Sequence, residues 1–244
     1  MIIVDTIKKS FGKVLAVNHA SFTAENGSIT TLLGANGSGK TTTFRAITGL
    51  LHPQEGKVII DGVHVEDDPV AAQKSLGVFP DKFGLYERLT TREHLVYFAE
   101  LHGLSGALLD KAIDEVVELL HMQDILDRRT KGFSQGQRMK VALSRSLMHK
   151  PKNFVLDEPT RGLDVTSVRM VRDLLLDLKA KGHCILMSSH VMAEVEILSD
   201  HIVMMAEGRI VAEGTSKALV SLSGEKTLED AFVALTTVDE GESL

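Results

Sequence analysis

The chain has 244 residues, of which 43% are hydrophobic and 25% charged, and these values are typical of a globular protein and exclude a fibrous or disordered one. Its formal net charge of −6 argues against a protein that coats nucleic acid through bulk charge. The one cysteine, Cys184, excludes an internal disulfide and favours a reducing compartment such as the cytosol. No segment approaches the ~18 apolar residues of a membrane span, so we expect any membrane contact to come through a partner.

Turn residues separate short apolar runs near the start of the chain, which predicts an antiparallel β lobe within about residues 1–66. Asn26-Gly27, Glu55-Gly56 and Asp61-Gly62 carry the turn chemistry of β-hairpins. Each pair is therefore expected to join two strands of a hairpin.

Helical periodicity begins near Thr90 and predicts an α-helical lobe over about residues 88–150. Thr90 and Glu93 have the spacing of a capping box, and the helix that they open is expected to reach Gly103. A second helix is expected near Leu108 to His121, because apolar residues recur there on one stripe.

Beyond residue 150 apolar strands alternate with helical segments, which predicts a mainly parallel core sheet with helices on its faces. The expected strands are 153–156, 184–187 and 202–205, and the expected helices are 168–178 and 191–198. A short tail follows over about 215–244, with a helix near 227–235 and an acidic end, Asp239 to Leu244, that we expect to be frayed. The fold class predicted is thus α/β.

The segment Gly34-Ala35-Asn36-Gly37-Ser38-Gly39-Lys40-Thr41 matches the pattern of a phosphate-binding loop and lies between an apolar strand, Ile29 to Leu33, and a helical stretch. In such a loop the glycines let backbone N–H groups point at the phosphates, Lys40 neutralises charge and the Thr41 hydroxyl can bind Mg²⁺. A glycine-rich turn with an accidental lysine is the alternative, and the flanking strand and helix argue against it.

Two carboxylates, Asp157 and Glu158, follow the apolar strand 153–156 at the strand end where α/β sheets bind ligands. Asp157 is the candidate for a Mg²⁺ ligand. Pro159 is expected to keep Glu158 extended and to project its carboxylate toward a water that attacks the γ-phosphate, as a general base. Alone, such a pair would more often be a solvated turn, and the phosphate-binding loop upstream favours the functional interpretation.

Phe133-Ser134-Gln135-Gly136-Gln137 precedes another helical pattern. Ser134 and Gln137 are spaced as a capping box, which by itself would explain both residues. A capped helix start beside a glycine is also an anion site.

These segments, followed by Gly162-Leu163-Asp164 and His190, occur in the order and approximate spacing of ABC transporter nucleotide-binding subunits. The chain resembles that family over nearly its whole length, and the resemblance implies a P-loop NTPase fold forming a single ABC ATPase domain over 1–244. It also implies ATP and Mg²⁺ as ligands and a head-to-tail dimer, expected to be a homodimer, with two ATP molecules between the subunits.

The resemblance assigns roles residue by residue. Residues implied to bind the nucleotide are Phe11, Gly34, Ala35, Asn36, Gly37, Ser38, Gly39, Lys40, Thr41, Thr42, Ser134, Gly136, Gln137 and Asp164. Catalysis is implied for Glu158, His190, Lys40 and Asp81, and metal binding for Thr41, Asp157 and Asp81. Phe11 resembles the aromatic residue that stacks on adenine, with burial in a strand as the alternative, and for Asp164 the alternative is an ordinary surface turn.

Asp81 departs from the family pattern, in which a glutamine ordinarily follows this strand, contacts Mg²⁺ and water and relays movement to the membrane subunit. Aspartate is shorter by a methylene and charged, so it would add negative charge near the metal and the phosphates. We expect an altered metal contact here.

The segment from Phe83 to Thr90 resembles exporter-type ABC ATPases, including those of sodium and drug efflux. The resemblance thus implies an ATP-hydrolysing subunit at the inner face of the cell membrane, held there by separate transmembrane permease subunits, with no nucleic acid as partner. Phe83, Leu85 and Tyr86 are candidates for an apolar groove that receives a partner helix, and burial under the helical lobe is the alternative for Leu85. The alternative function is a soluble ABC ATPase acting on a machine such as the ribosome or DNA.

Overall fold

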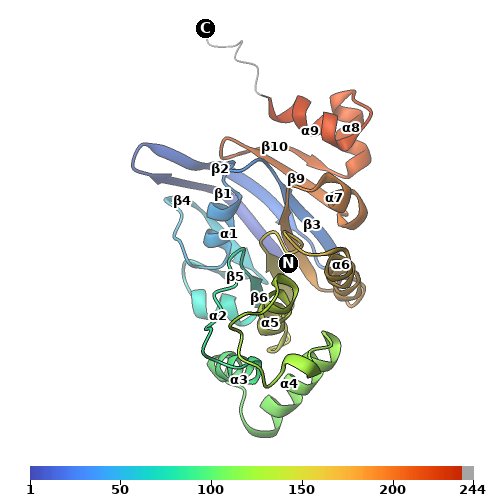
Figure 1. Cartoon of the computed structure of the whole chain (residues 1–244). Coiled ribbons are helices and arrows are strands. Elements are labelled where there is room, and N and C mark those ends of the chain that lie inside the picture. The colour runs from blue at the N-terminus through green and yellow to red at the C-terminus, as the bar shows by residue number, and fades with distance from the viewer. Residues whose placement is uncertain (238–244) are drawn as a thin grey trace.

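The computed structural model describes residues 1–237, so the acidic end at 239–244 lies outside the described residues. The fold is α/β, with a mainly parallel six-stranded sheet, a four-stranded antiparallel sheet and helices around them. Figure 1 shows the antiparallel sheet beside α1, helices α3 and α4 at one end of the molecule and helices α8 and α9 at the other.

The antiparallel sheet has the strand order β2-β1-β4-β5. Its strands are β1 (Ile2–Phe11), β2 (Val14–Ala24), β4 (Glu55–Ile60) and β5 (Val63–His64). The hairpin predicted at Asp61-Gly62 is confirmed, because Ile60 pairs with Val63 across it.

The two other predicted hairpins are wrong. Asn26-Gly27 joins β2 to β3 (Ser28–Leu33), and these strands belong to different sheets, so the turn is a crossing between sheets. Glu55-Gly56 lies inside β4, where the pairing with β1 shifts register. A Cβ on Gly56 would lie 2.4 Å from the carbonyl oxygen of Thr6, so the glycine permits a β-bulge at a close backbone approach.

The core sheet has the order β10-β9-β3-β8-β7-β6, and every neighbouring pair except β9 and β10 is parallel. Its other strands are β6 (Leu76–Phe79), β7 (Asn153–Leu156), β8 (Cys184–Ser189), β9 (His201–Ala206) and β10 (Arg209–Gly214). The predicted alternation of strands and helices is confirmed. The antiparallel edge strand β10 was not predicted.

Helices follow the start signals in the sequence. Helix α3 (Thr91–Leu101) begins after Thr90, and the predicted capping box with Glu93 is present. Helix α4 spans Gly106–Leu119, a short 3₁₀ turn spans Gln123–Ile125, and α5 spans Gln135–Leu147. The predicted stripe of α4 is buried, from Leu109 to Leu120. Elsewhere α1 spans Lys40–Ile47 and α2 spans Pro69–Lys74.

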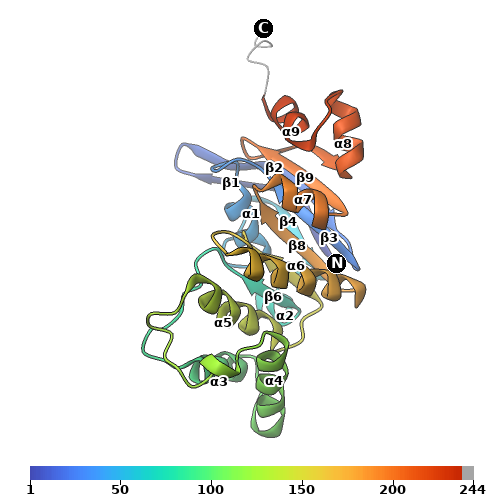
Figure 2. The ribbon, with the colours of Figure 1, turned by 45° about the vertical axis from the view of Figure 1, so that its right-hand side comes forward.

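Helices α6 (Val165–Ala180) and α7 (Met192–Leu198) follow β7 and β8, and Figure 2 shows α6 beside α5. Two helices end the described chain, α8 (Ser216–Ser223) and α9 (Leu228–Thr236). The helix predicted near 227–235 is therefore confirmed, and α8 was not predicted.

The buried apolar side chains form three clusters. One joins helices α3 to α6 to one face of the core sheet, the second lies between the two sheets and includes α1, and the third lies under α7, α8 and α9. Cys184 is in the second cluster, where burial raises the pKa of its thiol to about 11 and so keeps the thiol protonated at neutral pH.

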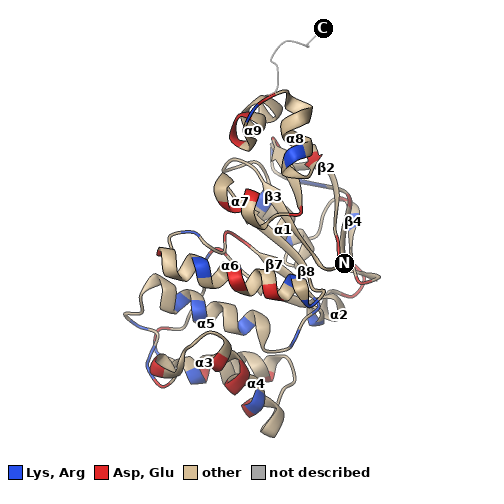
Figure 3. Ribbon diagram, turned by 90° about the vertical axis from the view of Figure 1, so that its right-hand side faces the viewer, with Lys and Arg blue, Asp and Glu red and all other residues tan. Residues whose placement is uncertain are grey.

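Charge is distributed over the helices without a single dominant sign. Figure 3 shows basic and acidic residues together on α6, and basic ones on α5 beside the more acidic α4. Lys150, just after α5, pairs with Glu115 of α4 at 2.7 Å. Among the described residues, none of the helices has the length and apolar character needed to cross a membrane.

Candidate functional site

The loop between β3 and α1 requires its glycines. Gly37 and Gly39 have φ of +85° and +111°, in the left-handed region that favours glycine. A Cβ on Gly39 would lie 2.5 Å from the carbonyl oxygen of Ala16 in β2 and 2.7 Å from Cε of Met205 in β9. The loop is also held from behind, because the N–H of Gly208 donates to the carbonyl oxygen of Ser38 at 2.9 Å.

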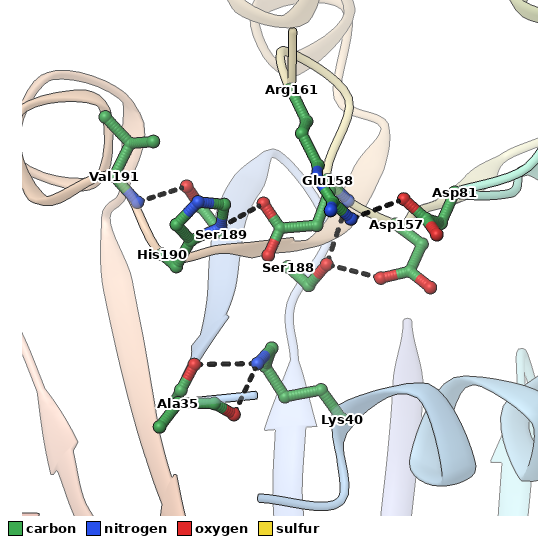
Figure 4. A network of polar contacts seen from close by, with 11 residues as sticks. Ala35, Lys40, Asp81, Asp157, Glu158, Arg161, Ser188, Ser189, His190 and Val191 are labelled. Carbon is green, nitrogen blue, oxygen red and sulfur yellow. Dashed lines mark hydrogen bonds and ion pairs between the residues drawn. The ribbon is translucent and has the colours of Figure 1, made fainter. Parts of the chain in front are cut away.

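Lys40 lies at the first position of α1 with its ammonium turned back over the loop. Its Nζ donates to the carbonyl oxygens of Gly34 at 2.7 Å and Ala35 at 3.0 Å (Figure 4). Burial lowers the pKa of Lys40, and the opposing charges of Glu158 and Asp157 partly offset this effect. The lysine thus faces the carboxylates across the pocket.

The loop has the features of an anion site. The hydroxyl of Ser38 is buried without a hydrogen-bond partner. Beside it lie the cationic Lys40 and the N-terminus of α1, where backbone N–H groups have no acceptor within the helix. A bound phosphate would accept from this hydroxyl and from the free N–H groups, so the residues present fit a nucleotide phosphate.

Asp157 follows β7 and is held by hydrogen bonds to the strands on both sides of it, β6 and β8. Its N–H donates to the carbonyl oxygen of Phe79 at the end of β6, at 2.8 Å. The hydroxyl of Ser188 in β8 donates to its Oδ1 at 2.6 Å. Burial raises the pKa of Asp157, the charges of Asp81 and Glu158 add to this effect, and the Ser188 hydrogen bond and Lys40 oppose it.

Glu158 has φ of +50°, so its backbone is left-handed, and the predicted extended conformation is wrong. Pro159 favours an extended backbone at Glu158, but a hydrogen bond opposes this preference. In it the N–H of Glu158 donates to the Ser188 hydroxyl at 2.9 Å. Its side chain is nevertheless directed over the pocket, where Nδ1 of His190 donates to Oε2 at 2.8 Å (Figure 4). The structure therefore brings these two residues together.

Asp81 and Arg161 form an ion pair at the edge of the same pocket, with Nη1 of Arg161 3.1 Å from Oδ1 of Asp81. The pocket brings the phosphate-binding loop together with the ends of β6 and β7. It is lined by Val14, Leu15, Ala16, Asn36, Gly37, Gly39, Lys40, Thr41, Thr42, Asp81, Asp157, Glu158 and Arg161.

The oxygen ligands suit Mg²⁺. The pocket holds the Thr41 hydroxyl and the carboxylates of Asp157 and Asp81, and Mg²⁺ is usually bound by one or two such groups together with substrate phosphates and water. The described residues include no group of three or more His, Cys, Asp and Glu side chains that could hold a metal ion.

Phe11 ends β1 and pairs with Val14 across a tight turn. Its side chain is 47% exposed, so burial in a strand, the alternative interpretation, is wrong. Phe11 does not itself line the pocket, but Val14 and Leu15 on the paired strand do. An exposed ring at this place is available to a base.

Ser134, Gly136, Gln137 and Asp164 lie outside this pocket. Ser134 and Gln137 form the predicted capping box at the start of α5. Asp164 caps α6. Its carboxylate accepts from the N–H of Ser167 at 2.9 Å, and this hydrogen bond lowers the pKa of Asp164. The two helix starts lie close together, since a Cβ on Gly136 would be 2.8 Å from Oγ of Ser167.

The segment after Asp81 divides between core and surface. Phe83 and Leu85 are partly buried and pack against the helical cluster. Tyr86 is 52% exposed, and with Tyr97 and Leu89 it lines a separate surface pocket.

Two polar side chains of the site were not predicted, those of Ser188 and Arg161, nor were the lining residues Val14, Leu15 and Ala16. Ser188 is the last but one residue of β8, which neighbours β7, so a search for polar residues near the ends of all parallel strands would have found it. Arg161 carries no such signal, because its partner Asp81 is 80 residues away in the chain.

Comparison with known proteins shows the family of this chain. The model of the ABC transporter family matches residues 17–161. The ABC transporter ATP-binding protein NatA of Bacillus subtilis (strain 168) is 38% identical to this chain over 222 residues, which are 91% of this chain and 90% of that protein. The chain belongs to the ABC transporter ATP-binding family. As a member, it is an ABC ATPase that binds ATP.

Other ABC proteins extend the comparison. The Nod factor export ATP-binding protein I of Rhizobium sp. (strain N33) is 36% identical, over 88% of this chain and 70% of that protein. A solved ATP-binding subunit of an ABC transporter superposes with a TM-score of 0.90 at 29% identity, covering 97% of this chain and all of that one. A dimeric ATP-binding cassette in a post-hydrolysis state has a TM-score of 0.80 at 22% identity and shares the ABC fold.

Proposed function

We propose that this chain is the ATP-hydrolysing subunit of an ABC exporter and works at the inner face of the membrane on separate transmembrane permease subunits. One observation carries the hydrolytic part of the proposal. Lys40 and the glycine-rich loop face a glutamate, Glu158, that is itself held by His190 at 2.8 Å. Export is supported by relatives named for Nod factor export and linearmycin resistance, and sodium or a drug is the proposed cargo.

The site residues divide the work of hydrolysis among themselves. Lys40, Ser38 and the loop N–H groups bind the phosphates and stabilise the charge that develops on them. The Glu158 carboxylate accepts the proton of the attacking water, and His190 orients that carboxylate through Oε2. Thr41 and Asp157 would hold Mg²⁺, which when bound neutralises negative charge on the phosphates.

The proposal includes a dimer. Ser134, Gly136 and Gln137 lie outside the pocket that holds Lys40, yet a capped helix start beside a glycine is an anion site. A second copy of this chain, placed head to tail, would bring its α5 start over the nucleotide of the first. Two such sites, each holding one ATP, would form in each dimer.

The test uses the Glu158→Gln chain, which should bind ATP and hydrolyse it very slowly. The tagged chain, with ATP and Mg²⁺, is used to capture partners from detergent-solubilised membranes of its own host, and the captured proteins are identified by mass spectrometry. The Glu158→Gln chain that also carries Lys40→Ala is the matched control for nucleotide-dependent capture. A polytopic membrane protein captured only by the chain with Lys40 supports the proposal. Capture of ribosomal or other soluble machinery alone would overturn the transporter role.

A further inference from the structure

The ion pair between Asp81 and Arg161 joins two loops at the edge of the nucleotide pocket. Asp81 lies two residues beyond β6, and Arg161 lies in the turn that follows Glu158. Nη1 of Arg161 donates to Oδ1 of Asp81 at 3.1 Å, and both residues line the pocket (Figure 4).

The position of this pair follows from the sheet. Strands β6 and β7 are parallel neighbours with Phe79 opposite Leu156, so the loops beyond them leave from the same edge. The N–H of Arg161 donates to the carbonyl oxygen of Glu158 at 3.2 Å, which closes the turn. The ion pair therefore connects the loop after β6 to the turn that begins with the proposed general base.

The charges around the pocket show what the pair does. Three carboxylates line it, those of Asp81, Asp157 and Glu158, and two cationic side chains oppose them, Lys40 and Arg161. Lys40 is committed to the phosphate-binding loop by its two carbonyl contacts. Without Arg161, the Asp81 carboxylate would repel nucleotide phosphates and offer an additional oxygen to a divalent cation.

We infer that Arg161 is a positioning residue, which through its ion pair holds the Asp81 carboxylate away from the magnesium position and cancels its charge. The loop after β6 then presents to the nucleotide a neutral surface instead of an acidic one. This inference rests on the proposed function, since it concerns how the same pocket selects its nucleotide and metal.

The test is a double-mutant cycle with Arg161→Gln, Asp81→Asn and the chain that carries both changes. Affinity for ATP is measured in EDTA with a fluorescent ATP analogue, and the Mg²⁺ concentration for half-maximal binding is measured with a non-hydrolysable ATP analogue. Arg161→Gln should weaken metal-free binding about two- to fivefold, the range for a partly exposed ion pair, and lower the Mg²⁺ requirement. Both effects should vanish when Asp81→Asn is also present, and Arg161→Lys should restore most of the affinity.

The outcomes separate the inference from the proposed function. If Arg161→Gln weakens binding equally with and without Asp81→Asn, or has no effect, Arg161 does not act through Asp81 and the inference is wrong. If the unmodified chain fails to bind ATP, the proposed function is wrong instead. The matched control is the ion pair between Arg92 and Asp127, at 2.8 Å and away from the pocket, whose neutralisation should leave nucleotide and Mg²⁺ affinity unchanged.

Discussion

At the scale of single residues, Ser188 connects two residues of the proposed site through one hydroxyl group. Its hydroxyl accepts from the N–H of Glu158 at 2.9 Å and donates its one hydrogen to Asp157 at 2.6 Å. The proposed metal ligand and the proposed base are thus fixed by the same atom. Because Ser188 does not line the pocket and acts on it through Asp157 and Glu158, it is a positioning residue.

Ser188→Ala should reduce ATP hydrolysis about 10- to 100-fold, the usual effect of losing the partner of a metal ligand. It should also leave Glu158 without its backbone contact in a strained conformation. Turnover and Mg²⁺ dependence, measured on purified protein, check this expectation. Ser189→Ala is the control, since within residues 1–237 the Ser189 hydroxyl accepts from the N–H of Val191 and bonds to neither Asp157 nor Glu158, and equal losses in both variants would contradict the argument.

His149 makes the fold sensitive to acid. Its ring is stacked on His102 at 3.8 Å between centroids, with Nε2 bonded to the carbonyl oxygen of Leu76 and Nδ1 buried without a partner. Burial, with the neighbouring His102 adding to it, lowers the pKa of His149 from 6.5 to about 4. Between these two values the unfolded chain binds more protons than the folded one, so stability falls as pH falls through that window.

His149→Gln should flatten this dependence by about one bound proton between pH 6.5 and 4. Urea unfolding at several pH values gives the slope directly. His52→Gln, at an exposed histidine, serves as the control and should keep the slope of the unmodified chain. An unchanged slope in His149→Gln would show that the acid sensitivity arises elsewhere.

At the scale of elements, α5 lies very close to β6. A Cβ on Gly77 would be 2.4 Å from the backbone carbonyl oxygen of Ser146 and 2.8 Å from the ring of Phe154. A backbone atom cannot move aside alone, so the whole helix must shift, and the start of α5 carries Ser134. Gly77 therefore sets the distance between the helix and the sheet.

Gly77→Ala should destabilise the fold by about 1–3 kcal/mol, the usual cost of overpacking. It should also lower ATP hydrolysis by displacing the α5 start, while ATP binding by the isolated chain should change little because the phosphate-binding loop is elsewhere. Urea unfolding, nucleotide titration and turnover on one preparation test all three. A variant as stable as the unmodified chain would show that α5 is free to move.

Elements whose signals are local could be predicted from the sequence. The capping boxes at Thr90 and Ser134 depend on residues three positions apart, and the phosphate-binding loop depends on an adjoining strand and helix. The turn chemistry of Asn26-Gly27 was also recognised, but the sheet that the next strand joins depends on β8 and β9, more than 150 residues away. Local chemistry therefore predicts turns better than it predicts pairing partners.

Contacts distant in sequence account for what was missed at the site. The hydrogen bond to the Ser188 hydroxyl overrides the extended backbone that Pro159 favours at Glu158. Arg161 forms its ion pair with Asp81, 80 positions away in the chain. Neither effect has a periodicity or spacing that a single sequence reveals. The glycine-rich loop before α1 could be predicted because its residues are continuous in the sequence.

At the scale of the whole molecule, the residues that the family likeness assigns to ATP divide into two surfaces. Lys40 and Glu158 line one pocket, while Ser134 and Gly136 lie at the start of α5 beside Ser167. In the proposed dimer each ATP meets the first surface of one copy and the second surface of the other. Defects on different surfaces should therefore complement each other.

Lys40→Ala and Ser134→Arg should each abolish hydrolysis, the first by losing phosphate charge and the second by obstructing the partner's nucleotide. An equal mixture of the two chains should recover about a quarter of the normal rate, because half of randomly formed dimers are mixed and each has one intact site of two. Steady-state turnover across mixing ratios measures this recovery. Two inactive chains that stay inactive together would argue against the head-to-tail arrangement.

The turn between β9 and β10 supports the phosphate-binding loop from behind, through Gly208 and Ser38. A two-residue surface turn is ordinarily a safe place to insert a reporter or an epitope. Here an insertion would break the contact that supports the phosphate-binding loop. We expect it to weaken nucleotide binding although no residue that faces the nucleotide has changed. A reporter belongs instead beside Gly224, between α8 and α9, where even an added side chain would find open space.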